Sequence, residues 1–81
     1  MLQYYRKEID KIDKEIVKLL KERMAVSEEI GKIKKEKNIP VTDKEREEEK
    51  LKEIADMAGL HYPSIHNIYT SIFEESRKIQ K

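Results

Sequence analysis

The chain has 81 residues, of which 18 are Lys or Arg and 17 are Asp or Glu, so 43% of its residues are charged and 37% are hydrophobic. This length bounds the chain to a single domain, residues 1–81. The charges nearly cancel to a formal net charge of +1, and no overall field therefore draws the protein to nucleic acid or to an anionic membrane surface. We expect neither as a partner.

The sequence has no Cys and only two His, which excludes disulfide frameworks, thiolate metal sites and a Cys nucleophile. His61 and His66 are five residues apart, which is not a helical ligand spacing, so we expect no metal site. The longest apolar run, residues 24–26, is far too short to span a membrane, and the charged start lacks the apolar centre of a signal peptide. A cytoplasmic location is the resulting expectation.

The first part of the chain carries a helical pattern. Residues 2–30 contain neither Gly nor Pro, and the apolar residues follow a heptad seam, with Leu2, Ile9, Ile16 and Ile30 at one position and Tyr5, Ile12, Leu19, Val26 and Ile33 at the other. We predict one continuous helix from about Leu2 to Lys37, which residues 38–40 (Asn-Ile-Pro) end. Gly31 lies beside the seam and costs about 1 kcal/mol relative to Ala in a helix.

This helix is longer than the domain that contains it. Thirty-odd residues at about 1.5 Å each span roughly 50 Å, whereas a compact chain of this length has a diameter of about 30 Å. The far end of the helix must therefore pack outside its own protomer. The simplest symmetric solution is an intertwined helical homodimer, which also enlarges the core of a small chain.

Two shorter helices complete the predicted fold. Residues 42–45 (Thr-Asp-Lys-Glu) have the pattern of a capping box that opens a second helix, which runs to about Ala58 and ends at Gly59. Pro63 suits the first turn of a third helix that continues to the C-terminus. The expected fold class is all-α, with three helices per chain.

Polar residues interrupt the apolar stripes of these helices. Arg23 takes one place in the seam otherwise filled by Leu2, Ile9, Ile16 and Ile30, and its burial requires an anion beside it. Only four of the 18 cationic residues are Arg, and Arg binds a carboxylate through a planar fork that Lys lacks. The competing interpretation is that Arg23 pairs with a Glu of a neighbouring helix to fix the register.

The other two helices show the same feature. Glu47 heads the apolar stripe of the second helix, and the inward face of the third helix continues into Ser76 and Gln80. Lys34 lies eleven residues after Arg23, so their Cα atoms are roughly 16 Å apart on one face and their long side chains can hold a small dianion between them. The sequence offers no nucleophile with an adjacent base and no Gly-rich phosphate loop. We therefore predict a pocket that binds and orients an anion.

The chain resembles the all-helical chorismate mutases over nearly its whole length, from Arg6 to Gln80. Four segments carry the resemblance: residues 6–13 (RKEIDKID), 19–23 (LLKER), 30–34 (IGKIK) and 40–47 (PVTDKERE). Between Leu51 and Tyr69 the match lies in the apolar pattern more than in identity. The resemblance implies an intertwined dimer with two active sites, in agreement with the length argument.

The resemblance also implies roles for individual residues. Arg23 resembles the Arg that grips a substrate carboxylate, and Arg6 resembles the Arg that reaches the same site from the other protomer. Lys34 matches the Lys that contacts a carboxylate and the ether oxygen, with Gln80 as its partner at that oxygen.

Four further positions match supporting groups of that family. Asp43, mainly through its backbone, and Glu47 resemble the groups that hold the ring hydroxyl, while Arg46 and Ser76 resemble supporting carboxylate contacts. The implied catalytic residues are Arg23, Lys34, Glu47 and Gln80.

The implied activity is the rearrangement of chorismate to prephenate in the biosynthesis of Phe and Tyr, with chorismate as the small-molecule partner and without a cofactor. Three alternatives remain open: a related helical lyase that acts on isochorismate, a non-catalytic module that regulates a partner synthase, and a structural bundle in which Arg23 and Glu47 merely pair. Because Glu47 suits the hydroxyl of chorismate, it argues mildly against the lyase.

Overall fold

The structure is a computed structural model that describes residues 1–81. It consists of α1 (Leu2–Glu36), α2 (Lys44–Ala58), one 3-10 turn, η1 (Gly59–His61), and α3 (Tyr62–Gln80), and it has no strand. The predicted all-α class is confirmed. None of these helices is both long enough and apolar enough to cross a membrane.

The end of α1 has the hydrogen bonds of a Schellman motif. Asn38 adopts a left-handed conformation with φ of 54°, its N–H donates to the Lys35 carbonyl oxygen, and the Ile39 N–H donates to the Lys34 carbonyl oxygen. Asn tolerates this conformation better than most residues, so it ends the helix where the sequence predicted.

The start of α2 differs from the predicted capping box. Asp43, not Thr42, is the N-cap residue, and its Oδ1 accepts a hydrogen bond of 3.0 Å from the Arg46 N–H. The box assigned to residues 42–45 was therefore wrong by one residue, since Asp and Thr are both good caps and Asp43 stands nearer to the charged first turn.

At the other end of α2, Gly59 has φ of 56° and ψ of −125°, a backbone conformation that suits Gly.

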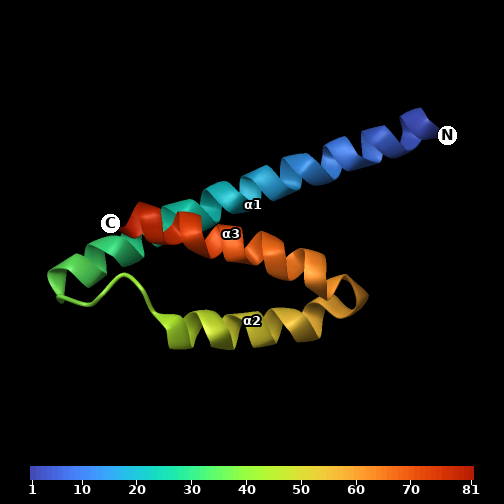
Figure 1. The fold of residues 1–81 in the computed structure, drawn as a ribbon. Coiled ribbons are helices and arrows are strands. Elements are labelled where there is room, and N and C mark those ends of the chain that lie inside the picture. The colour runs from blue at the N-terminus through green and yellow to red at the C-terminus, as the bar shows by residue number, and fades with distance from the viewer.

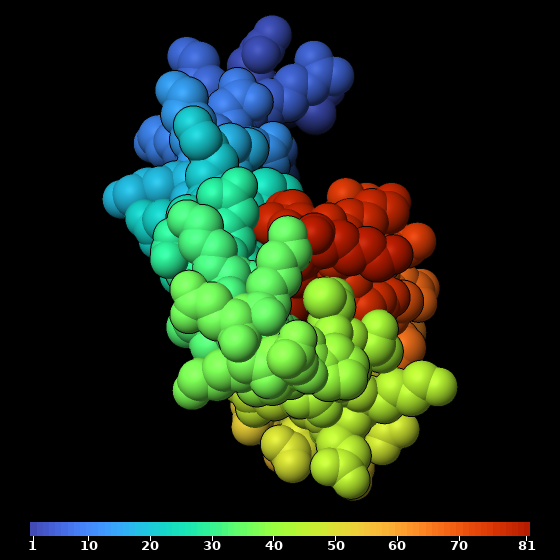
Figure 2. All heavy atoms as spheres, turned by 90° about the vertical axis from the view of Figure 1, so that its left-hand side faces the viewer, coloured from blue at the N-terminus to red at the C-terminus, as the bar shows by residue number.

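The three helices form a layer with α3 in the middle (Figure 1). α2, η1 and α3 make an antiparallel hairpin, α3 also packs on the C-terminal half of α1, and α1 and α2 do not pack against each other. The N-terminal half of α1 projects beyond this body, as the blue atoms at the top of Figure 2 show. The longest dimension is 54 Å and the radius of gyration is 15.5 Å, against roughly 12 Å for a compact chain of this length.

The single chain has a very small core. Only five of the 81 residues are buried: Ser27, Gly31, Ile54, Phe73 and Gln80. The apolar seam of α1 is largely exposed to solvent, including Leu2, Tyr5, Ile9, Ile12, Ile16, Leu19, Val26, Ile30 and Ile33. A stripe of this size on an isolated helix is typical of a surface that packs on another chain.

Candidate active site

A pocket of about 300 Å³ lies where the C-terminal half of α1, the start of α2 and the end of α3 meet. Seven of the eight residues predicted to contact the substrate line it: Arg23, Lys34, Asp43, Arg46, Glu47, Ser76 and Gln80. The volume is at the lower end of the range for small-molecule sites. Residues separated by as many as 57 positions in the sequence are thus brought to one hollow.

The pocket is far more cationic than the chain as a whole. Its lining includes five cationic residues, Arg23, Lys34, Arg46, Lys50 and Arg77, and two acidic residues, Asp43 and Glu47. The formal net charge of the whole chain is only +1. Positive charge is therefore gathered at this one place, which favours an anionic ligand over a neutral one.

Arg23 is half-buried and forms no ion pair within the chain. Its guanidinium carbon lies 5.8 Å from the centre of the Phe73 ring, a cation–π distance. A structural bundle in which Arg23 pairs with Glu47 is contradicted, because Glu47 pairs with another residue. The Arg23 guanidinium keeps its hydrogen-bond donors available toward the pocket.

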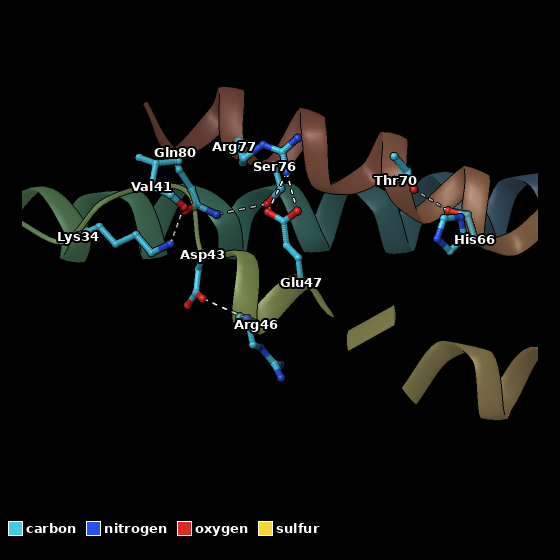
Figure 3. Close-up of polar contacts among 10 residues, drawn as sticks. All are labelled: Lys34, Val41, Asp43, Arg46, Glu47, His66, Thr70, Ser76, Arg77 and Gln80. Carbon is cyan, nitrogen blue, oxygen red and sulfur yellow. Dashed lines mark hydrogen bonds and ion pairs between the residues drawn. The ribbon is translucent and has the colours of Figure 1, made fainter. Parts of the chain in front are cut away.

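Lys34 points toward the segment between α1 and α2 (Figure 3). Its Nζ donates a hydrogen bond of 2.9 Å to the Val41 carbonyl oxygen. This contact fixes the ammonium group at the wall of the pocket and leaves it two further N–H donors.

Glu47 and Arg77 form the shortest ion pair in the molecule. Arg77 Nη1 lies 2.7 Å from both Glu47 Oε1 and Glu47 Oε2, and both side chains are about 30% exposed. The two residues extend toward each other from α2 and α3, across the open end of the hairpin (Figure 3). An Arg paired in this way was not predicted from the sequence.

A partly buried chain of hydrogen bonds links α1 to the end of α3. Ser27 Oγ and Ser76 Oγ are 2.7 Å apart, and Gln80 Nε2 donates to Ser76 Oγ over 3.3 Å. Gln80 Oε1 is buried and has no hydrogen-bond partner. Such an unsatisfied atom is rare in a folded protein, and here it belongs to a residue that lines the pocket.

Asp43 and Arg46 lie at the exposed rim of the pocket. The carboxylate of Asp43 caps α2, and Arg46 Nη1 lies 3.9 Å from Glu49 Oε2, which is a weak surface contact. The Arg46 side chain is therefore available to a ligand at the mouth of the pocket.

Arg6 is the one predicted site residue that is not in the pocket. It lies on the exposed N-terminal part of α1, seventeen residues before Arg23, which corresponds to about 25 Å along the helix. Within one chain Arg6 cannot reach the other seven residues.

Comparison with known proteins identifies the family. A family model described as chorismate mutase type II matches residues 5–81. The chain belongs to this family.

Individual relatives agree with this assignment. A chorismate mutase from Methanocaldococcus jannaschii is 32% identical, with 94% of this chain and 80% of the relative covered. A bifunctional chorismate mutase/prephenate dehydratase from Aquifex aeolicus is 36% identical over 99% of this chain, which spans only 24% of that relative's length. A solved structure of a conserved hypothetical protein from Pyrococcus furiosus has a TM-score of 0.84 and 45% identity, covering 99% of this chain and 95% of the other.

In this member of the chorismate mutase family, the sequence did not predict two cationic residues that line the pocket, Lys50 and Arg77, nor Ser27, which lies outside that lining and bonds to Ser76. Arg77 stands four residues after Phe73 and three before Gln80, so a strict helical period along the inward face of α3 would have included it. Ser27 carries no signal of its own, since a Ser on a charged helix is usually exposed. Only the packing of α3 on α1 reveals it.

Proposed function

We propose that this chain is a chorismate mutase, which converts chorismate to prephenate in the biosynthesis of aromatic amino acids. The observation that carries the proposal is the cationic pocket, in which seven of the eight residues expected to contact the substrate line one hollow. Membership of the type II family supports the same assignment.

The proposed reaction needs neither an activated nucleophile nor a general acid–base pair. Chorismate rearranges in one unimolecular step, in which the ether C–O bond breaks while a C–C bond forms and the electrons move around a six-membered ring. The contribution of the protein is to hold the enolpyruvyl side chain over the ring, so that the reacting carbons meet in a near-attack geometry. The substrate has two carboxylates, and cationic side chains can bind each of them to hold this geometry.

The cationic residues bind the substrate carboxylates and the ether oxygen. Arg23, with its guanidinium over Phe73 and no internal anion, binds one carboxylate, and Arg46 and Ser76 give supporting contacts. Lys34 contacts a carboxylate and the ether oxygen. Negative charge grows on this oxygen as the C–O bond breaks, so the interaction is stronger in the transition state than in the ground state.

Gln80 is the second donor to the ether oxygen. A half-turn of its amide would let Oε1 accept a hydrogen bond from the Ser76 hydroxyl, to which Ser27 would donate in turn, and would place Nε2 at the buried position that Oε1 now holds, so contact with the substrate also requires the side chain to turn toward the pocket. The same rotation would give the unsatisfied Oε1 a partner. Glu47 and the backbone at Asp43 receive the ring hydroxyl.

The site needs a second copy of the chain to be complete. The exposed apolar seam of α1 supports an intertwined homodimer, and a groove lined by Leu20, Met24, Ile68 and Ile72 offers apolar surface beside it. Arg23 and Ser76 line both this groove and the cationic pocket. An α1 helix from the partner seated on this side can bring its own Arg to the pocket, which is the role we assign to Arg6.

Incubation of the purified protein with chorismate tests the proposal. We expect loss of chorismate with formation of prephenate, followed by spectrophotometry and by NMR of the product, at a rate well above that of the uncatalysed reaction. Pyruvate release from isochorismate, without prephenate formation from chorismate, would instead identify the lyase. Binding of prephenate without turnover would identify a regulatory module.

A further inference from the structure

We infer that Arg77 is a positioning residue that acts through Glu47. It neutralises this carboxylate and fixes its two oxygens at the pocket wall, so that Glu47 can accept a hydrogen bond from the hydroxyl of a dianionic substrate. The inference rests on the proposed function, because it assigns a role within that same site.

The first support is the geometry of the pair. A single guanidinium nitrogen, Arg77 Nη1, contacts both carboxylate oxygens at 2.7 Å. Both residues line the cationic pocket, and each side chain is about 30% exposed, so the pair is neither deep in a core nor loose on the surface. Each carboxylate oxygen has a further lone pair, with which Glu47 can accept a hydrogen bond from a ligand.

The second support is electrostatic. An ionised Glu facing a substrate with two carboxylates repels it, and this repulsion is strong in a site from which the substrate displaces water. A guanidinium held on the Glu cancels the charge while preserving an ionic, acceptor-only group that binds a hydroxyl more strongly than a neutral amide does. With this ion pair, one site can accept a hydrogen bond from the substrate hydroxyl and still bind a substrate that carries two negative charges.

The position of the pair in the fold suits this role. Glu47 is in the first turns of α2 and Arg77 in the last turn of α3, where the helix dipoles favour an acid and a base respectively. Arg77 is the only ion-pair partner of Glu47, since Arg46 pairs with Glu49, Lys50 pairs with Glu53, and Arg23 and Lys34 form no ion pair.

Two competing roles for Arg77 have to be distinguished from this one. In the first, the ion pair only fastens α2 to α3 and has no part in substrate recognition. In the second, Arg77 binds a substrate carboxylate directly.

A double-mutant cycle on the intact chain separates the three roles. The variants are Arg77→Met, Glu47→Gln and the combination of both, assayed with chorismate for KM and kcat. Arg77→Met leaves an unpaired carboxylate facing the dianion in both ground and transition states, so we expect KM to rise on the order of 10-fold with kcat changed by less than about threefold. In the combined variant the neutral amide needs no cation, and KM should fall back below that of Arg77→Met.

Control variants isolate the effect. Lys78→Met removes one positive charge from the adjacent residue, whose Nζ contacts only Glu75 and which is outside the pocket, so its KM should match that of the parent. Arg77→Lys keeps a cation but loses the planar guanidinium, and should give an intermediate KM. If Arg77→Met fails to fold, Arg77→Lys replaces it in the double-mutant cycle.

The outcomes decide between the three roles. A KM for the combined variant equal to or above that of Arg77→Met means that Arg77 binds the substrate itself, and overturns the inference. An unchanged KM with a lower melting temperature means that the pair only fastens the helices, and also overturns it. If the parent does not convert chorismate, the proposed function fails, and the same variants are then titrated calorimetrically with prephenate. We then expect the Kd for prephenate to rise in Arg77→Met and to fall again in the combined variant. Absence of this pattern, or no binding of prephenate to the parent, overturns the inference.

Discussion

The backbone of Gln80 lies directly against Gly31. A Cβ placed on Gly31 would lie 2.8 Å from both the Cα and the carbonyl oxygen of Gln80, closer than side chains approach backbone in folded proteins. α1 and α3 therefore meet here without a side chain between them. This contact buries Gln80 one residue before the C-terminus, where a helix would otherwise fray.

The contact predicts the effect of Gly31→Ala. The added methyl must push the end of α3 outward, which costs about 1–3 kcal/mol in packing, while Ala recovers about 1 kcal/mol of helix propensity. We expect a small loss of stability in urea unfolding and a fall in kcat/KM on the order of 10-fold, because Gln80 moves away from the reacting bond. Lys32→Ala, at an exposed neighbouring position, is the control. Parental kcat/KM in Gly31→Ala would show that the position of Gln80 is not critical.

The partly buried hydroxyl chain predicts the effect of Ser27→Ala. Removal of Ser27 Oγ deprives Ser76 of its partner at 2.7 Å, which should lower the free energy of unfolding by about 1 kcal/mol. If the chain orients the Gln80 amide, kcat should also fall severalfold while KM changes little. Ser64→Ala is a matched control on α3, since Ser64 is exposed and lines neither the pocket nor the apolar groove. Equal kinetics for the two variants would separate Ser27 from catalysis.

Local sequence signals predicted the helices well. The heptad seam, Asn38, Gly59 and Pro63 bounded them to within about one residue, because each signal acts through the backbone of its own neighbourhood. The capping residue of α2 was wrong because two good caps, Thr42 and Asp43, are adjacent and the choice depends on the path of the preceding loop.

Seven of the predicted site residues line one pocket, but the contacts among them were not predicted. Polar residues on apolar stripes, such as Arg23 and Gln80, can be recognised from periodicity together with the family resemblance. The pairing of Glu47 with Arg77 depends on how the hairpin brings the start of α2 to the end of α3, which no local pattern encodes. For the same reason, the partner of Ser76 on α1 was not foreseen.

The site that we propose to be shared between two protomers predicts complementation. Arg6→Ala and Arg23→Ala should each be nearly inactive, since each removes a carboxylate contact from both sites of a homodimer. When the two variants are mixed, unfolded and refolded together, activity should return to roughly a quarter of the parental value, because half of the dimers are mixed and each of these has one intact site.

Two results would contradict this prediction. Sedimentation equilibrium that shows a folded 9.7 kDa monomer at micromolar concentration would exclude the dimer. A mixture no more active than its components would place Arg6 outside the site. Refolding each variant alone, under the same conditions, controls for recovery.

The last prediction tests Gln80 at the ether oxygen. Replacement by Glu keeps the size of the side chain but exchanges the amide N–H for a carboxylate, which only accepts hydrogen bonds when ionised. An ionised carboxylate against an oxygen that gains negative charge opposes the reaction, so kcat/KM of Gln80→Glu at pH 7 should fall on the order of 10²-fold. Lowering the pH toward the range in which a Glu takes up a proton restores a donor, and kcat/KM should therefore rise as the pH falls.

The parent supplies the comparison for this profile. Its proposed reaction requires no proton transfer, so its kcat/KM should change little over the same range, and division of the variant's profile by the parental one removes any effect on the substrate or on the rest of the pocket. Thermal melts at each pH establish that both proteins remain folded. A ratio that stays constant between about pH 5 and pH 8 would mean that residue 80 does not touch the reacting bond. In that case, α3 would contribute to the substrate site through Ser76 and through the ion pair of Arg77 with Glu47.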